Sequence, residues 1–463
     1  MSKFMDKFTK ITEKHLMPIA SKMATQKHLT ALKDGFVFTM PFLIVGSIIL
    51  LLVNLPFGSP ELSPGTPNPM YMEWYANLMA AHKAQWVQPF YVSMGIMSLF
   101  VSFGIGYSLS NQYKLNGITG GFLTLFTFLM TSAKLDWVPM AKDPQVMNVF
   151  HVDGGWMPVM DARYLDAKGL FTAIIGSFIA IEIYRFMTTK KMVIKLPDSV
   201  PPAIAKSFEL LTPIIAVIVI LQPINNFIQS TGKMIPEVIM NTFAPLVHAS
   251  DSLPAIILIL IIVHVLWFAG LHGVNVVVAI INPIILTNLA ANQEALQAGT
   301  VLPHVFAGGF LDAFVYLGGA GATLGLAIAM ARSKSEHLSA IGKLGTVPGL
   351  FNINEPIIFG APIVMNPILF IPFIGIPIIN ATIAWYALKL GLVGKIVTLV
   401  PWTTPGPIAA FLATNFGVTA LLLSTFLVFL SYLIYKPFVA IYEKELEKEY
   451  SGESEQEASV ETV

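Results

Sequence analysis

The 463-residue sequence contains no cysteine and few charged residues, and both shortages exclude classes of protein. Without cysteine the chain cannot form a disulfide, a thiolate metal site or a cysteine-bound covalent intermediate. Charged residues make up 12% of the chain and hydrophobic residues 55%, which is roughly half the charged fraction of a soluble globular protein. The formal net charge is zero, so composition gives no reason to expect a nucleic-acid partner. The sequence therefore predicts a protein of the lipid bilayer.

Long apolar runs indicate how often the chain crosses the membrane, because a spanning helix needs about 20 such residues. In the first half we expect five spans, at residues 36–55, 89–109, 117–132, 167–187 and 208–229. The second half is expected to add about five spans and two re-entrant hairpins. The predicted fold class is an all-α polytopic membrane protein with about ten transmembrane helices and amphipathic interfacial helices.

The distribution of charge predicts the orientation of the chain. Residues 1–34 carry seven lysines against three acidic residues, and 185–206 carries five basic residues against one aspartate. The loop 133–166 has three basic and five acidic residues. The positive-inside rule then places 1–34 and 185–206 in the cytoplasm and 133–166 outside. Residues 1–33 are interpreted as an amphipathic helix on the inner surface, or as a helix that only leads into the first span.

Interrupted apolar segments distinguish the second half of the chain. Gly, Pro, Asn and His break the apolar pattern at residues 269–275, 281–283, 347–356 and 400–407. Broken segments cannot expose free backbone amides to lipid, so they must be buried in protein or line a wet cavity, as at the binding site of a transporter.

The same features predict the division of the chain into domains. We expect a first membrane domain at 1–187, a cytoplasmic linker at 188–207 and a second membrane domain with the hairpins at 208–442. The acidic segment 443–463 is predicted to be a disordered cytoplasmic tail.

Glu355 is the strongest candidate for a functional residue, because it is the only acidic residue within 337–442. A carboxylate at mid-membrane costs roughly 2.5 to 3.5 kcal/mol on insertion scales and usually has a function. Pro356 follows it, which predicts a helix break, and Asn352 and Asn354 add amide donors and acceptors. Such a group suits a polyhydroxylated ligand. The alternative is a glutamate in an aqueous loop.

Two further interrupted segments contain candidate ligand-binding residues. His272 lies in GLHG next to Gly273, where glycine permits close approach of a ligand, although a lone histidine in an apolar region is often structural. Trp402, followed by Thr403, offers either a face for stacking on a sugar ring or an interfacial anchor.

Signatures of common enzymes are absent from the sequence. It has no HExxH, no Walker A loop, no GxSxG and no carboxylate cluster for a metal, so neither a metal site nor a cofactor is expected. The glycine-rich segment 318–325 follows no predicted strand, and close helix packing through small residues explains it better than a phosphate loop.

Three segments carry a resemblance to a known family: FNINEPIIFGAPIVMNP (351–367), LPDSVPPAIAKSFE (196–209) and DGFVFTMPFLIVGS (34–47). They resemble enzyme IIC, the membrane subunit of the phosphoenolpyruvate-dependent sugar phosphotransferase system. The branch that they resemble transports lactose, cellobiose and N,N'-diacetylchitobiose. The similarity extends over residues 1–445.

The resemblance implies a homodimer in the bacterial cytoplasmic membrane, with both termini in the cytoplasm. The N-terminal half would form the dimer, and the C-terminal half would bind a disaccharide and move in an elevator-like manner. Glu355 and Asn354 would hold sugar hydroxyls, His272 would be a further ligand, and Trp402 would be a stacking partner.

The resemblance also implies a phosphoryl donor. The sugar would be presented to a cytoplasmic IIB subunit that bears a phosphocysteine. Because phosphoryl transfer benefits from an acceptor for the proton of the attacking hydroxyl, Glu355 is also a candidate for the base. Since this chain has no cysteine, the IIB subunit must be a separate polypeptide, and phosphotransferase activity is expected only in its presence.

Other classes of function fit some of the same residues. The broken helices and lone carboxylate also suit an ion-coupled sugar symporter with Glu355 as the proton carrier. An intramembrane glycan hydrolase would need a second nearby carboxylate, which the sequence does not offer.

Overall fold

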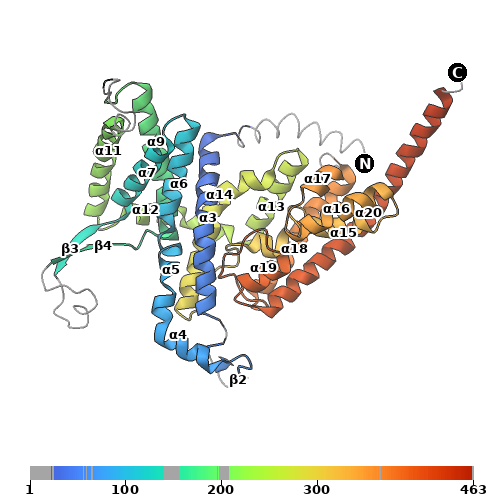
Figure 1. The fold of residues 1–463 in the computed structure, drawn as a ribbon, viewed down its shortest axis with the longest axis horizontal. Coiled ribbons are helices and arrows are strands. Elements are labelled where there is room, and N and C mark those ends of the chain that lie inside the picture. The colour runs from blue at the N-terminus through green and yellow to red at the C-terminus, as the bar shows by residue number, and fades with distance from the viewer. Residues whose placement is uncertain are drawn as a thin grey trace. The chain divides into compact units, whose positions relative to one another are not determined.

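The protein is almost entirely helical (Figure 1). The computed structural model describes residues 22, 25–55, 57–58, 60–63, 66–139, 156–194, 197, 208–361, 363 and 366–460. Four short strands form two antiparallel pairs, β1 (Glu61–Ser63) with β2 (Thr66–Pro67) and β3 (Leu135–Pro139) with β4 (Trp156–Met160). The predicted all-α class is confirmed, since within these ranges the strands are short and the remaining elements are helices.

The chain divides into two compact units. The first unit comprises Lys27–Leu43 and Phe90–Pro245, and the second comprises Ile44–Pro89 and the chain from Leu246 onward. The helices of the first unit are the start of α3 (Lys27–Val53), η2 (Met94–Ile96), α6 (Met97–Gln112), α7 (Gly117–Ser132), η3 (Ala167–Gly169), α9 (Leu170–Thr189), α11 (Leu211–Ser230) and most of α12 (Ile235–Ser250).

The second unit contains the remaining helices. Two of them lie near its start, α4 (Glu73–Trp86) and the short α5 (Gln88–Tyr91), which ends in the first unit. The others are α13 (Leu253–Phe268), α14 (Gly273–Gln297), η4 (Leu311–Val315), α15 (Thr323–Ala331), α16 (Glu336–Leu350), α17 (Glu355–Gly360), α18 (Pro367–Lys389), α19 (Gly406–Ala413) and α20 (Val418–Val460).

Close packing of α6, α7 and α9 forms the centre of the first unit. A Cβ atom on Gly120 of α7 would lie 2.8 Å from the carbonyl oxygen of Gly106 on α6. Phe128 of α7 is fully buried beside Leu165 and Ala173. Helices in a membrane associate through such small residues, because they let two backbones approach closely.

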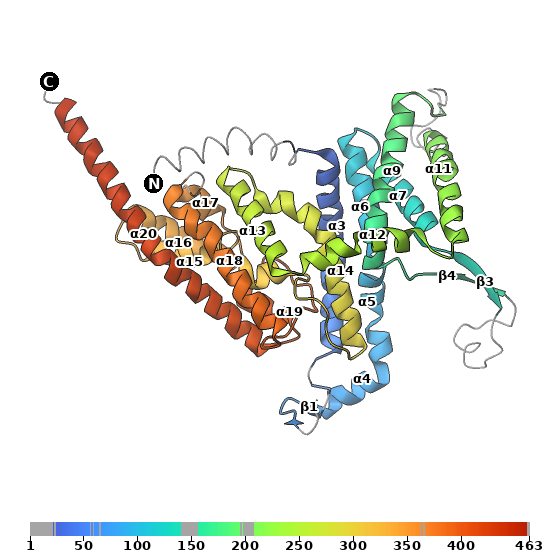
Figure 2. The ribbon, with the colours of Figure 1, turned by 180° about the vertical axis from the view of Figure 1, so that it is seen from behind.

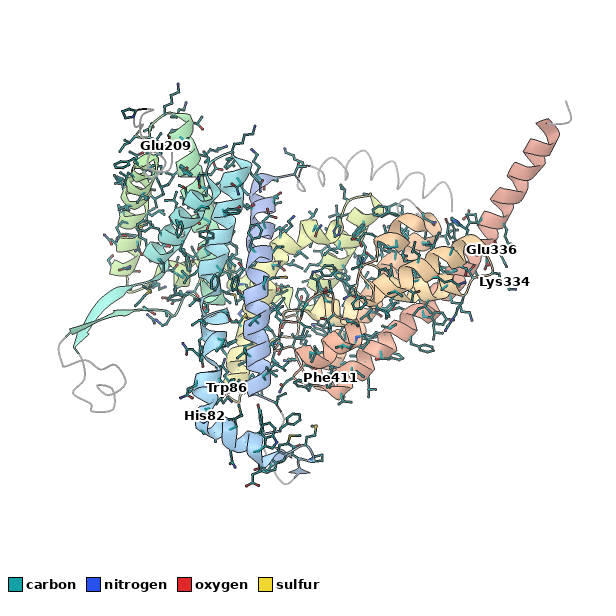
Figure 3. The ribbon with its side chains drawn as sticks, viewed as in Figure 1. His82, Trp86, Glu209, Lys334, Glu336 and Phe411 are labelled. Atoms are coloured by element: carbon teal, nitrogen blue, oxygen red, sulfur yellow. The ribbon has the colours of Figure 1, made fainter. Side chains whose placement is uncertain are left out.

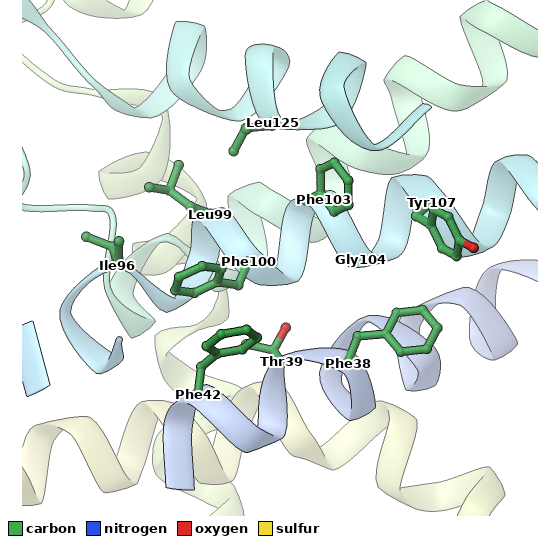
Figure 4. Close-up of a pocket in the computed structure, with 10 residues that line it drawn as sticks. All are labelled: Phe38, Thr39, Phe42, Ile96, Leu99, Phe100, Phe103, Gly104, Tyr107 and Leu125. Carbon is green, nitrogen blue, oxygen red and sulfur yellow. The ribbon is translucent and has the colours of Figure 1, made fainter. Parts of the chain in front are cut away.

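A cavity of about 620 Å³ lies between α3, α6 and α7 of this unit (Figure 4). Phe42 of α3 and Phe100 of α6 stack there with ring centroids 5.1 Å apart. The Thr39 hydroxyl donates to the Gly35 carbonyl of its own helix at 2.7 Å. The cavity is therefore almost wholly apolar and lacks the polar groups that orient a sugar.

In the second unit, α15 contacts α16 and α20, and α13 contacts α14 and α18 (Figure 2). A Cβ atom on Gly325 of α15 would lie 2.5 Å from the backbone nitrogen of Tyr432 on α20. The interpretation of the 318–325 segment as close helix packing is thus confirmed at Gly325. The earlier glycines of this segment, Gly318, Gly319 and Gly321, have a different role, which is described with the candidate site.

The helices support a multi-pass membrane protein. Within the described residues, six helices are long and apolar enough to cross a bilayer, and two bent helix pairs could raise the number to eight. Each of the five spans predicted in the first half coincides with a helix or with the bent pair Glu73–Tyr91 and Met94–Gln112. These six to eight helices do not test the expected total of about ten spans.

Three of the four predicted interruptions are present. The chain leaves helical geometry between α13 and α14, between α16 and α17, and before α19. The prediction of a break at 281–283 was wrong, because α14 continues through Pro283. The Thr287 hydroxyl donates to the Pro283 carbonyl at 2.7 Å. Proline is tolerated in membrane helices where side chains and neighbouring helices compensate for its effect on the backbone.

The C-terminal segment is helical where the sequence favours disorder. α20 extends to Val460, and Glu443 accepts hydrogen bonds from the Ser333 hydroxyl at 2.9 Å and the Ser335 amide at 2.7 Å. Repeated Glu and Lys are also good helix formers. Most of the predicted N-terminal amphipathic helix and of the linker 188–207 lies outside the described residues. The proposed domain boundaries therefore stay predictions.

Candidate functional site

A glycine-rich loop between η4 and α15 forms the base of the candidate site. Gly318, Gly319 and Gly321 adopt φ values of +91°, +94° and +82°, and Ala322 has φ 54°. Only glycine takes this left-handed region without steric cost. The glycines therefore shape a tight turn inside the second unit, which is a role that helix packing alone did not predict.

The turn between α16 and α17 holds this loop through two asparagine side chains. Asn352 Oδ1 accepts a hydrogen bond from the Gly318 amide at 2.9 Å. Asn354 Nδ2 donates to the Ala320 carbonyl at 2.8 Å. Both side chains are buried. Because a buried amide group must be bonded, these contacts fix the position of the residues that precede Glu355.

Two other helices bind the same loop at Gly321. His264 of α13 accepts from the Gly321 amide through Nε2 at 2.9 Å, and its Nδ1 lies 2.6 Å from the Leu260 carbonyl. Tyr435 of α20 donates its hydroxyl to the Gly321 carbonyl at 2.7 Å. Because both ring nitrogens of His264 bond to backbone groups, this buried histidine has a structural role.

Asn352 also joins the third interrupted segment to the site. Its Nδ2 donates to the Trp402 carbonyl at 2.6 Å and to the Thr404 carbonyl at 3.3 Å. Its own φ of 61° is left-handed, a conformation that asparagine tolerates better than most residues. One side chain thus ties three chain breaks together.

Glu355 begins α17 directly after this turn, so the predicted helix break is confirmed. Pro356 occupies the first turn of α17, where proline costs no hydrogen bond. The Glu355 side chain is exposed. Among the described residues, none donates a hydrogen bond to its carboxylate or forms an ion pair with it. The carboxylate is therefore available to a ligand, while its backbone is held by the neighbouring asparagines.

His272 is the N-terminal cap of α14, and its side chain is exposed. Its Nδ1 accepts from the Asn275 amide at 3.2 Å, which makes Nε2 the protonated nitrogen of the neutral ring. The Trp267 ring lies 4.3 Å from the His272 ring, centroid to centroid. A Cβ atom on Gly273 would overlap the Val263 carbonyl, so glycine is required for α14 to start there.

The packing of α13 against α18 brings His272 and Glu355 to the same end of this helix pair. The ring of Phe268, near the end of α13, lies 4.1 Å from that of Phe370, near the start of α18. At the opposite end, Trp385 Nε1 donates to the Asp251 carbonyl at 2.9 Å. The two helices are therefore antiparallel, and both the GLHG turn after α13 and the α17 helix before α18 lie at one end.

Trp402 is 49% exposed, whereas Thr403 is half-buried. The bond from Asn352 holds only the backbone of Trp402, so its indole is open to either predicted role. Of the seven candidate residues, the contacts bring Asn352, Asn354 and Trp402 together, place Glu355 beside them, and put His272 and Gly273 at the same helix end.

One residue of this region was overlooked in the sequence. Asp312 in η4 is the only acidic residue within 295–335, so the signal that identified Glu355 would have found it too. η4 is a π-helix, a distortion that often occurs at functional sites. The Asp312 carbonyl oxygen would lie 3.7 Å from a Cβ atom on Gly406, where α19 begins. The described residues contain no group of three His, Asp or Glu able to hold a metal ion.

Known proteins resemble this chain over nearly its whole length. Residues 33–377 match the model of the family described as phosphotransferase system, EIIC. The lichenan permease IIC component of Bacillus subtilis (strain 168) is 36% identical over 453 residues, which are 96% of each chain. The cellobiose-specific EIIC component of Geobacillus stearothermophilus is 38% identical over 454 residues, which are 95% of each.

A solved structure has the same fold. It is the crystal structure of the transporter ChbC, the IIC component from the N,N'-diacetylchitobiose-specific phosphotransferase system. It superimposes with a TM-score of 0.82 at 35% identity, covering 96% of this chain and 99% of the other. The agreement of sequence and fold over both compact units indicates a common architecture.

Proposed function

The chain belongs to the phosphotransferase system EIIC family, and on this basis we propose that it imports a disaccharide such as cellobiose or N,N'-diacetylchitobiose for phosphorylation. The names of its relatives support this class of sugar, and the lactose type belongs to the same proposal. The phosphoryl donor is a IIB domain or subunit with a phosphocysteine, which this sequence, having no cysteine, does not itself supply.

The observation that carries the proposal is the Glu355 carboxylate, which is exposed and without a partner among the described residues. A carboxylate accepts hydrogen bonds from hydroxyl groups more strongly than a neutral acceptor does. Asn352 and Asn354 donate to backbone carbonyls, so they position Glu355, and Asn354 Oδ1 can accept from the sugar as well. His272 Nε2 serves as a donor, and Trp402 as a stacking face.

The proposed chemistry is transfer of a phosphoryl group from the IIB cysteine to the primary hydroxyl of the sugar. The O–P bond forms, the S–P bond breaks, the sulfur leaves as a thiolate, and Glu355 receives the hydroxyl proton. Such reactions depend mainly on positioning and charge stabilisation. The contribution of this chain is therefore to hold the hydroxyl in place and to accept its proton.

Glu355→Gln tests the binding role. It keeps the size of the side chain but removes the charge, and hydrogen bonds to charged groups contribute about 1.5 to 3 kcal/mol. We expect the affinity of the purified protein for cellobiose, N,N'-diacetylchitobiose or lactose, measured by calorimetry, to fall roughly 10- to 100-fold. Glu336→Gln is the control, since Glu336 is an exposed glutamate at the start of α16 (Figure 3). Wild-type affinity in Glu355→Gln would refute the binding role.

A second assay separates the base role from binding. With IIB and its phosphoryl donor present and sugar at saturation, Glu355→Gln should fail to form sugar phosphate. Retained phosphorylation would exclude Glu355 as the base. In vesicles that lack IIB, accumulation of free sugar driven by a proton or sodium gradient would instead identify a symporter.

We propose the remaining family features on the same basis. The chain acts as a homodimer, the 208–442 domain moves as an elevator between outward and inward states, and both termini face the cytoplasm of a bacterium. The basic segments 1–34 and 185–206 support this orientation.

A further inference from the structure

A second cavity of the first unit lies between α9 and α11, far in sequence from the candidate sugar site. It has a volume of about 910 Å³. Its walls are apolar, with Phe178 and Ile183 on α9 and Ala216 and Ile220 on α11. Both helices are long and apolar enough to span a bilayer. A groove of this kind suits a hydrocarbon chain.

One end of the groove is charged. Glu182, Arg185 and Lys190 line it where α9 ends at Thr189. Arg185 and Lys190 are exposed. Glu209, just before α11, is labelled in Figure 3 and is not among the residues that line the groove. Among the described residues, the lining therefore carries two basic residues against one acidic residue.

The single acidic residue is already neutralised by protein donors. Glu182 accepts from the Tyr113 hydroxyl at 2.6 Å, and it pairs with Arg185 Nη2 at 2.6 Å and with His28 Nε2 at 3.1 Å. Burial, together with the Glu182 carboxylate, raises the pKa of Tyr113 to about 12, so its hydroxyl stays a donor at neutral pH. Glu182 is therefore not available to repel an anionic ligand.

The two basic side chains keep donors for an anion. A guanidinium has five N–H groups, so Arg185 can bind Glu182 and a further acceptor together. The Lys190 ammonium has no hydrogen-bond or ion-pair partner among the described residues, and only its backbone amide is bonded, to the Phe186 carbonyl at 2.9 Å. The charge run 185–206 places this end of the groove at the cytoplasmic leaflet, where acidic lipids attract Lys and Arg.

We propose that this groove binds one acidic phospholipid, with its phosphate on Arg185 and Lys190 and an acyl chain between α9 and α11. Apolar walls inside the membrane and cations at its edge match an amphiphile with an anionic head. A sugar, being polar, would not match the apolar walls, and a free phosphate would bind the cations but leave the walls uncovered.

Native mass spectrometry of the full-length protein tests the headgroup contact. Dioleoyl phosphatidylglycerol should stay bound to the wild type at one molecule per chain, and dioleoyl phosphatidylcholine, with the same tails, should bind at least tenfold more weakly. Arg185→Gln with Lys190→Gln should reduce phosphatidylglycerol retention at least tenfold. Lys334→Gln with Lys343→Gln removes two exposed lysines elsewhere and should leave retention unchanged.

A second pair of variants tests the acyl contact. Ala216→Trp fills the groove and should displace phosphatidylglycerol, whereas Val219→Trp, at a position of α11 that is 65% exposed and outside the groove, should not. Unchanged melting temperatures exclude misfolding in each variant. The proposal fails if both lipids bind equally, if the double variant retains phosphatidylglycerol, or if inorganic phosphate alone displaces it. It also fails if the only effect of Ala216→Trp in the mass spectrum concerns a dimer of the chain, with phosphatidylglycerol still bound.

Discussion

At the scale of single residues, the site separates two kinds of polar side chain. His264, Asn352 and Asn354 are buried and bonded to backbone groups, whereas Glu355 is exposed and has no partner among the described residues. A buried polar group without a bond costs about 1 to 3 kcal/mol, so the three buried side chains are explained by the fold. The fold gives the Glu355 carboxylate no such bond, which is why we propose that it binds the sugar.

Gly321→Ala tests whether the glycine loop requires its left-handed backbone. Gly321 has φ +82°, and an added Cβ would overlap the Phe373 ring. We expect a loss of stability of about 2 to 4 kcal/mol, seen as a lower melting temperature in detergent, with weaker sugar binding.

Gly375→Ala is the matched control, because Gly375 lies in α18 with no atom within 4 Å of an added Cβ. It should leave stability unchanged or raise it by up to about 1 kcal/mol. Equal melting temperatures for the two variants would contradict the role of Gly321.

At the scale of elements, the site consists of the ends of broken helices. The loop before α15, the turn before α17 and the segment before α19 each leave backbone groups without helical partners. Inside a membrane protein such groups must be satisfied by other parts of the chain. Asn352 does this for two of the three segments at once.

Asn352→Ala should therefore remove the bonds that join the turn before α17 to the loop before α15 and to the segment before α19. It leaves the Gly318 amide and the Trp402 carbonyl without their bonds, at a cost of about 1 to 3 kcal/mol for each group that remains buried. We expect a lower melting temperature and a sugar affinity reduced at least tenfold, because Glu355 loses its support. Asn241→Ala, at an exposed position of α12, is the control and should behave as the wild type. Normal sugar affinity in Asn352→Ala would mean that the turn holds Glu355 without this side chain.

At the scale of the whole molecule, transport requires that the sugar site face each side of the membrane in turn. The absence of cysteine makes this testable, because an introduced cysteine is then the only thiol in the sequence that can react with a labelling reagent. Ile353 is 40% exposed and lies between the two site asparagines, and Val301, in the loop after α14, is 88% exposed.

Ile353→Cys should react with a membrane-impermeant maleimide from both sides of oriented vesicles, and added sugar should change the ratio of the two rates. Val301→Cys should react from one side only, with or without sugar. If Ile353→Cys also reacted from a single side under all conditions, alternating exposure of the site would be excluded.

The sequence by itself determined the membrane class and the positions of the first five apolar helices, and it identified Glu355 as the candidate functional residue. Long apolar runs and an isolated carboxylate are local signals, because hydrocarbon penalises charge wherever it occurs. Pro356 likewise predicted the helix break, because a proline ring restricts the backbone conformation of the residue directly before it.

Only the tertiary structure decided how the other polar residues are used. Asn352 and Asn354 are predicted as ligands from the sequence, and the fold adds that their amide nitrogens bond to the Trp402 and Ala320 carbonyls. Pro283 looks like a break and lies within a continuous helix. A buried polar group is bonded by whatever segment the fold brings to it, and partners such as Gly318, 34 residues from Asn352, are set by packing and not by neighbouring residues.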